Sequence, residues 1–282
     1  MTVRYSVYVP NFAEYGDPRV LLDLARRAEN AGWDGLFIWD HLTLDRRAGI
    51  AVADPWVLLT AVALSTERIR FGTLVTPVAR RRPAKLARET TTLDLLSGGR
   101  LVLGVGLGAP ISEEYGVWGE PTDPRVLAER LDEGLEVLTG LWTGDPVQVE
   151  GRHYVARDVA FAPTPHQRPR IPIWVGGVWP HRAPFRRAAR FDGAAPILDE
   201  GVRQRPPKPA QLPELCDVVL EQRGSLDGFE IVLSGETRDD AQGRELVSEL
   251  AAGGATWWNE SLNPWRCDLD AARRRIEAGP PA

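Results

Sequence analysis

The chain has 282 residues, of which 43% are hydrophobic and 26% charged, so it can bury a sizeable core and lacks the composition of a disordered protein. A formal net charge of −5 argues against extensive nucleic-acid binding, and no apolar run reaches membrane-spanning length. Two cysteines, Cys216 and Cys267, are too few for a disulfide framework. We therefore expect one domain (1–282), cytoplasmic, with no nucleic-acid or membrane partner.

The first half of the chain alternates predicted strands and helices. Apolar segments of strand length occupy residues 3–9, 34–39, 69–75 and 101–105. Segments with helical spacing follow them, near 18–31, 55–65, 83–97 and 124–138. Two strands that are joined by a helix run parallel, and the crossover is almost always right-handed, so this half predicts four βα units.

The alternation breaks at residues 144–166, where two short strands around Glu150 and Gly151 predict a hairpin insertion after the fourth βα unit. It then resumes with strands at 172–175, 192–197, 229–233 and 254–258, and with helices near 184–190, 212–223, 238–252 and 268–278. Eight strands alternating with about eight helices predict an α/β fold of the (β/α)8, or TIM-barrel, type. A doubly wound open sheet is the alternative.

In such a barrel, functional residues follow the carboxyl ends of the strands. His41 stands directly after the second predicted strand and beside Asp40. We predict a catalytic role for this pair, with His41 as a proton carrier or hydrogen-bond donor. The alternatives are a packed structural histidine and an aspartate that only caps a turn.

Glycines follow the fourth and fifth predicted strands. Gly106 and Gly108 depart from the dinucleotide pattern G-x-G-x-x-G, so we interpret them as a wall on which a flat ligand lies; tight packing is the alternative. Gly176 and Gly177 precede a predicted helix and Arg182, a combination that favours phosphate binding.

Two further features point to the same end of the barrel. The run Arg80–Arg82 is either a group of solvated charges or a group that attracts the anionic tail of a ligand. Trp257 and Trp258 alternate in the eighth strand, so one is expected to face the barrel interior and the other the helices. The predicted substrate pocket contains Asn11, Trp39, Trp257 and Asn259.

Three motifs carry a family resemblance that covers nearly the whole chain. They are W-D-H at 39–41, the run GTLVTPVARRRPAKLARETTTLDLLSGGRLVLGVGLG at 72–108, and IPIWVGG at 171–177. Together they resemble the bacterial luciferase-like superfamily of flavin- and deazaflavin-dependent oxidoreductases. The combination T-L-D-x-L-S-x-G-R with L-G-V-G-x-G is specific for this superfamily.

The resemblance implies a barrel that holds F420 or FMN at the carboxyl ends of its strands. It also implies a bulge with a non-prolyl cis peptide in the third strand, within the segment 73–75. The implied cofactor-binding residues, with the residues of the expected phosphate site, are Thr73, Leu74, Val75, Thr76, Gly106, Gly108, Gly176, Gly177, Val178 and Arg182.

The resemblance further implies an enzyme that transfers a hydride between F420 and a small organic substrate. F420 is favoured because the Asp40-His41 pair resembles F420-using members and because Arg80–Arg82 suit an anionic tail. An FMN-dependent monooxygenase that uses reduced flavin and O2 is the alternative, and a non-catalytic flavin-binding relative is a third. Related sugar-phosphate dehydrogenases carry an acid where this chain has Ala109, which puts that reaction in doubt.

A metal-dependent hydrolase is disfavoured, because the four histidines form no H-x-H pair, and no metal is expected. The resemblance leaves a homodimer open.

Overall fold

We describe the protein from a computed structural model, which describes residues 3–200, 203–237 and 241–281. Within these residues, parallel strands form a closed barrel, and the pairing of β8 with β10 completes it. The predicted (β/α)8 barrel is thereby confirmed. Its strands are β1 (Arg4–Val9), β2 (Gly35–Ile38), β3 (Arg70–Pro77), β4 (Leu101–Gly106), β7 (Ile173–Trp179), β8 (Gly193–Glu200), β10 (Glu230–Gly235) and β11 (Trp257–Ser261).

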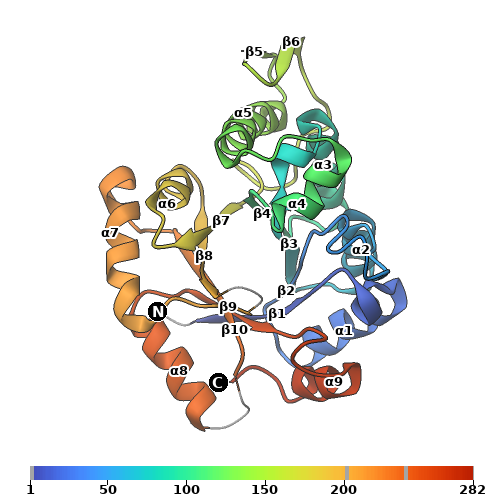
Figure 1. Cartoon of the computed structure of the whole chain (residues 1–282), viewed down its shortest axis with the longest axis vertical. Coiled ribbons are helices and arrows are strands. Elements are labelled where there is room, and N and C mark those ends of the chain that lie inside the picture. Colours follow the sequence, from blue (N-terminus) through green and yellow to red (C-terminus); the bar gives the residue numbers. More distant parts are fainter. Residues whose placement is uncertain (1–2, 201–202, 238–240, 282) are drawn as a thin grey trace.

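Helices surround the strands as an outer ring (Figure 1). The main helices are α1 (Pro18–Asn30), α2 (Pro55–Ser65), α3 (Pro83–Leu96), α5 (Pro124–Thr143), α6 (Arg182–Ala188), α7 (Leu212–Arg223), α8 (Ala241–Ala252) and α9 (Leu269–Glu277). Short elements lie in the loops: α4 (Ile111–Glu114) and the 3-10 turns η1 (Ala13–Gly16), η2 (Val78–Arg80), η3 (Gly116–Trp118) and η4 (Pro209–Gln211). Residues 238–240, which open one predicted helix, lie outside the described residues.

An aspartate followed by proline starts three of the helices. Asp17, Asp54 and Asp123 each accept a hydrogen bond from a backbone N–H group of the first turn, and proline occupies the first helical position. The carboxylate satisfies an otherwise unpaired N–H group, and the ring of proline fixes a helical φ angle. These D-P dipeptides explain why the sequence located these helices so closely.

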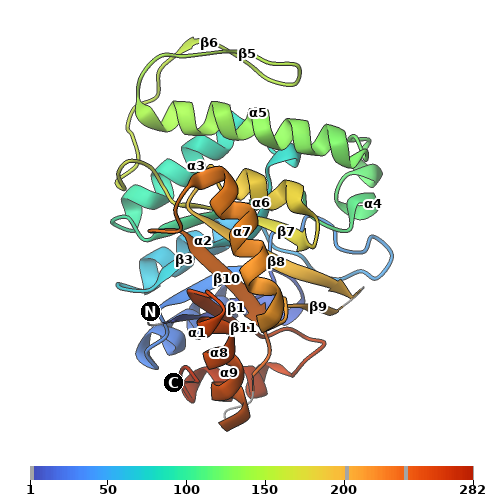
Figure 2. The same ribbon diagram turned by 90° about the vertical axis from the view of Figure 1, so that its left-hand side faces the viewer.

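The predicted insertion is a hairpin of β5 (Val147–Glu150) and β6 (Val155–Val159), which pair antiparallel. It lies over the outer side of α5, away from the barrel strands (Figure 2). The chain then returns to the amino end of the barrel. There the side chain of Gln167 donates a hydrogen bond of 2.8 Å to the carbonyl oxygen of Leu101, the first residue of β4.

Apolar side chains fill two regions, one inside the barrel and one between strands and helices. The interior cluster consists of Phe37, Leu74, Val102, Trp174, Ala195, Val232 and Trp257. Trp258 belongs instead to the larger cluster under the helices. The predicted division of Trp257 and Trp258 between the two faces is therefore confirmed.

Three strand ends differ from the prediction. β7 continues through Gly176 and Gly177 to Trp179, because it stays paired with β8 along this length. β8 turns back into an unpredicted short strand, β9 (Arg203–Arg205). β11 begins at Trp257 instead of residue 254, because Gly254, with φ of +112°, belongs to the turn that ends α8.

Candidate active site

The imidazole of His41 is held by a buried carboxylate at the carboxyl ends of the strands. His41 follows β2, and its Nδ1 lies 2.9 Å from Oε1 of Glu114, at the end of α4. The side chain of Glu114 is 1% exposed and that of His41 is 14% exposed. A carboxylate at Nδ1 fixes the ring orientation and leaves Nε2 as the nitrogen that a ligand can reach. Among the described residues, none bonds to Nε2.

Glu114 also organises the loop that follows His41. Its carboxylate accepts backbone N–H bonds from Leu42 at 3.0 Å and Leu44 at 3.2 Å, and it forms an ion pair with Arg80 at 3.0 Å. Burial raises the pKa of Glu114, but the hydrogen bond from His41, the charge of Arg80 and the N–H of Leu42 outweigh it. The net effect is a pKa below the ordinary value, so Glu114 is ionised at neutral pH.

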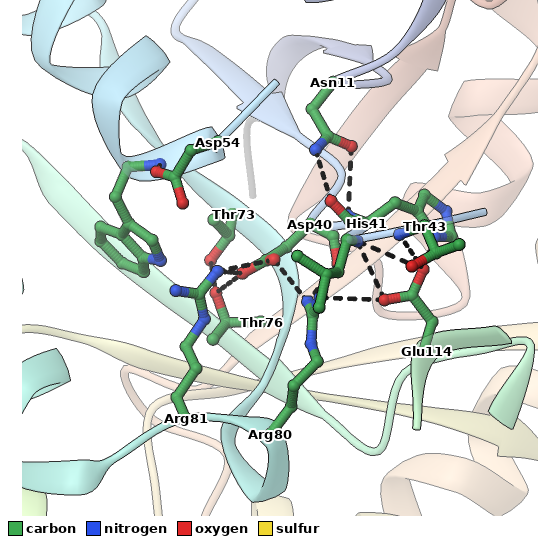
Figure 3. Close-up of polar contacts among 12 residues, drawn as sticks. Asn11, Asp40, His41, Thr43, Asp54, Thr73, Thr76, Arg80, Arg81 and Glu114 are labelled. Carbon is green, nitrogen blue, oxygen red and sulfur yellow. Dashed lines mark hydrogen bonds and ion pairs between the residues drawn. The ribbon is translucent and has the colours of Figure 1, made fainter. Parts of the chain in front are cut away.

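Asp40 lies at the centre of an ion-pair network in Figure 3. Its carboxylate, which is fully buried, pairs with Arg80 at 2.7 Å and with Arg81 at 2.8 Å. Thr76 donates a further hydrogen bond to it at 2.8 Å. Arg80 contacts both Asp40 and Glu114, and so joins the loops after β2, β3 and β4.

This network corrects two expectations from the sequence. Asp40 has no exposed surface on its carboxylate, so we reassign it from catalysis to positioning. The side chains of Arg80 and Arg81 are 8% and 18% exposed and are neutralised by buried carboxylates, so neither is free to attract an anionic tail. Arg82 alone of the three is exposed.

A bulge interrupts β3 at the level of this network. The pairing of β3 with β4 shifts between Thr73 and Thr76, and the peptide bond between Leu74 and Val75 is cis, as the family resemblance implied. Thr73, Leu74 and Thr76 are buried, and only Val75 keeps accessible surface. Of the four predicted cofactor-facing residues of β3, the structure therefore offers Val75 as the one with a free face.

Val75 lies on the backbone of the neighbouring strands. A Cβ atom added to Gly106 would lie 2.7 Å from the Val75 side chain, and one added to Gly176 would lie 2.6 Å from it. Strands β4 and β7 therefore need glycine here to accommodate the bulge. The result is an apolar shelf, Val75 over Gly106 and Gly176, without polar side chains. Such a shelf fits the flat, largely apolar ring of a flavin or deazaflavin.

The predicted phosphate site is not the turn before a helix that the sequence suggested. Gly177 lies inside β7 and Arg182 opens α6, where its guanidinium pairs with Glu214 at 2.8 Å on the surface. Arg182 is therefore already paired. Gly176, Gly177 and Val178 keep partial exposure, and so does Gly108, which packs against Pro77 at the end of β3.

Gly177 has a packing role that is testable apart from any ligand. A Cβ atom added there would lie 2.3 Å from Cβ of Pro184 in α6. We expect Gly177→Ala to lower the free energy of unfolding by about 1–3 kcal/mol, measured by urea denaturation. The control is Gly116→Ala, whose added Cβ meets only the Thr122 methyl at 3.3 Å. Equal stability of the two variants would contradict this close packing.

The predicted pocket residues divide between the two ends of the barrel. Asn11 is buried and bonds to the backbone N–H and carbonyl of His41, so it positions that residue. Trp39 is next to His41, with ring centroids 5.8 Å apart. Asn259 is buried inside the barrel, bonded to Ser6 and Ser234.

Trp257 was wrongly placed in the pocket. It is the first residue of β11 and pairs with Arg4, the first residue of β1, so it lies at the amino end of the barrel. The error follows from the start of β11, which is three residues later than predicted.

Sequence reasoning missed the residue that holds His41. Glu114 was not singled out, although two neighbouring arginines after the third strand need acidic partners and Glu113-Glu114 is an acidic pair in the next loop. It also missed Phe12 and Trp265, whose rings are 5.5 Å apart; Phe12 lies 5.8 Å from His41. No periodicity marks such loop aromatics.

The described part of the chain contains neither a membrane-spanning helix nor a metal-binding cluster. In residues 3–200, 203–237 and 241–281 no helix combines the length and apolarity that crossing a membrane requires. Over the same ranges, no three histidine, cysteine or acidic side chains are grouped as a metal site requires.

The fold and the site together define a TIM-type barrel whose polar cluster lies where such barrels place their active sites. Residues 3–200 match the family described as luciferase-like monooxygenase. This match covers more than half of the chain, and the chain therefore belongs to the luciferase-like monooxygenase family.

Curated relatives include F420-dependent glucose-6-phosphate dehydrogenases. That of Amycolatopsis mediterranei is 36% identical over 168 residues, which cover 58% of this chain and 50% of the relative. That of Nakamurella multipartita is 35% identical over 236 residues, which cover 76% of this chain and 66% of the relative. The chain spans about half the length of the first of these relatives.

Solved structures share the fold at low sequence identity. An F420-dependent secondary alcohol dehydrogenase in complex with an F420-acetone adduct has a TM-score of 0.79 at 16% identity and covers 100% of this chain and 99% of its own. The oxygenating constituent of 3,6-diketocamphane monooxygenase of Pseudomonas putida, in complex with FMN, has a TM-score of 0.75 at 16% identity, with 98% and 97% covered. These likenesses support the fold.

Proposed function

We propose that the protein is an F420-dependent oxidoreductase that transfers a hydride between F420 and a small organic substrate. The observation that carries the proposal is the His41–Glu114 pair, at 2.9 Å, beside the bulge of β3. The names of the relatives with 33–39% identity support F420 as the cofactor. When bound, F420 supplies two electrons and a proton as one hydride.

The residues of the chain provide the proton that accompanies this hydride. His41 Nε2 gives a proton to the substrate oxygen during reduction, or takes it from an alcohol during oxidation. The buried carboxylate of Glu114, at Nδ1, stabilises the ring when it carries both protons. Val75, Gly106 and Gly176 form the apolar shelf on which the ring lies.

We further propose that the substrate is uncharged near His41 and partly apolar. Phe12 and Trp39 lie against His41, each with its centroid 5.8 Å away, and Trp265 continues this aromatic cluster. Arg80 and Arg81, which bond to Asp40 and, in the case of Arg80, to the Glu114 that holds His41, are already paired with carboxylates. A sugar phosphate would therefore find no free arginine in this cluster, which argues against the substrate of the named relatives.

The test is expression in a host that makes F420, followed by mass spectrometry of the retained cofactor. The purified protein is then supplied with reduced F420 and a panel of aromatic and aliphatic ketones and enones, and F420 absorbance is followed without oxygen. Turnover supports the proposal. Retention of FMN with substrate-dependent O2 consumption would instead favour the monooxygenase alternative. Binding of F420 without turnover of any acceptor would favour a non-catalytic relative.

Arg82 remains the testable part of the arginine hypothesis. Its side chain is exposed at the start of α3 and no acidic partner is found for it among the described residues. We expect Arg82→Gln to weaken F420 binding about twofold to fivefold at low salt and FMN binding less, because F420 has the longer anionic tail. The difference should shrink at high salt. Fluorescence titration measures it, and equal losses for both ligands would remove this role.

A further inference from the structure

A cavity lies at the amino end of the barrel, opposite the candidate active site. Its volume is about 200 Å³, and its walls include Arg4, Arg70, Arg168, Arg170, Trp174 and Trp257. Arg4 and Arg70 begin β1 and β3, and Trp257 begins β11. Arg168 and Arg170 come from the segment that returns from the β5–β6 hairpin. We call it the amino-end cavity.

The walls of this cavity carry excess positive charge. Its four arginines face two acids, Asp192 and Glu230. Arg170 pairs with Asp192 at 3.0 Å, and Arg4 pairs with Glu230. Arg70 and Arg168 form no ion pair within the described chain, and the charged lining residues sum to two positive units. Burial, and then the charge of Arg4, lower the pKa of Arg70, while the charges of Glu230 and Asp94 act in the opposite direction.

Hydrogen-bond donors in the walls also lack acceptors. Trp174 is 2% exposed and Trp257 is 1% exposed, and neither indole N–H group has a partner among the described residues. Nε of Arg70 is buried without a partner as well, although another nitrogen of its guanidinium donates to Gln167 at 2.8 Å. Unpaired buried donors are costly, and three donors beside one cavity indicate a missing acceptor.

We propose that the amino-end cavity binds a phosphate group, either as inorganic phosphate or as the end of a small phosphate monoester. A tetrahedral oxyanion has enough acceptor oxygens for the indole and guanidinium donors and supplies the missing negative charge. The exposed rim residues Arg168, Pro169 and Gly228 leave the cavity open to solution. This site is separate from the proposed cofactor site, because the two lie at opposite ends of the strands.

The test measures binding by isothermal titration, at constant ionic strength, with inorganic phosphate, glycerol 1-phosphate, acetate and chloride. Phosphate and the monoester should bind, while acetate and chloride should not compete at equal concentration. If glycerol 1-phosphate binds more tightly than inorganic phosphate, the ligand is an organic phosphate. If inorganic phosphate binds more tightly, the ligand is the free ion. Absence of binding by both would overturn the proposal.

Variants locate the binding at this end of the barrel. Arg70→Gln should raise the dissociation constant of phosphate at least about tenfold, since a charge-assisted bond is lost. Trp257→Phe, which keeps an aromatic ring but removes the N–H group, should raise it about threefold to tenfold. Arg26→Gln removes the same charge from the exposed side of α1 and should leave binding unchanged. Unaltered affinity in the first two variants would overturn the assignment.

Nuclear magnetic resonance of the unaltered protein tests the same proposal without relying on a variant that folds. The chain has 10 tryptophans, and each indole N–H gives its own nuclear magnetic resonance signal. Phosphate should shift the signals of Trp174 and Trp257 the most, because their N–H groups gain an acceptor. If the largest shifts belong to other tryptophans, assigned from single Trp→Phe variants, phosphate binds elsewhere and the proposal is wrong.

Discussion

His41→Asn should lower turnover with F420 by about 10²- to 10⁴-fold, the usual cost of losing a general acid or base. Asparagine keeps some hydrogen-bonding capacity but cannot give or take the proton, so the loss should appear in kcat more than in KM. The melting temperature should stay within a few degrees, since Glu114 keeps its bonds to Arg80 and to the backbone N–H groups of Leu42 and Leu44 when the ring is lost. Stopped-flow kinetics and thermal unfolding measure the two effects.

The chain offers a matched control in a second histidine–glutamate pair. His153 in the insertion has its Nε2 2.9 Å from Oε2 of Glu129, far from the site. His153→Asn should leave kcat unchanged. If His41→Asn instead melts far lower yet reacts normally per folded molecule, His41 is a structural histidine and its catalytic role is refuted.

Asp40→Asn should lower the free energy of unfolding by about 3–5 kcal/mol, the cost of removing one partner from a buried ion-pair network. The variant leaves Arg80 with Glu114 as its remaining buried carboxylate, and it leaves Arg81 with none among the described residues. Urea denaturation measures the loss. We also expect weaker activity through displacement of Arg80, with the shape of the pH profile retained, because Asp40 positions other groups and does not itself exchange the proton.

Asp132→Asn is the control for this variant. Asp132 also bonds a guanidinium through two contacts, to Arg187 at 2.7 and 2.8 Å, but its side chain is 38% exposed. Because the carboxylate of Asp132 is reached by solvent, its neutralisation should cost no more than about 1 kcal/mol. If Asp40→Asn is as mild as Asp132→Asn, the buried network does not stabilise the fold, and the positioning role of Asp40 fails with it.

Local chemistry explains why most of the fold was predictable from the sequence. Local signals mark the helix starts: D-P dipeptides open α1, α2 and α5, and Pro83 opens α3. The apolar strand runs are local signals as well. The ends of β7 and β11 were less predictable. β7 is extended by pairing with β8, which is a long-range contact, and glycine at 176 and 177 suggested an end where the strand continues.

The site was predictable in location and less so in the role of each residue. The barrel rule brought His41, Asp40 and the arginines to one end, and the family motifs added the bulge of β3. The sequence does not distinguish an arginine in solvent from one in a buried ion pair, so it could not predict the burial of Arg80 and Arg81. Glu114, the second partner of Arg80, lies 34 residues further along the chain in a different loop, and only the fold brings the two together.

The bridge made by Arg80 bears on how the mouth of the barrel moves. One guanidinium links the loops after β2, β3 and β4. We therefore expect these loops to open together, as one cooperative unit, and we expect such opening to be rare. The amides of Leu42 and Leu44, whose acceptor is Glu114, should then exchange with solvent deuterium at closely similar slow rates.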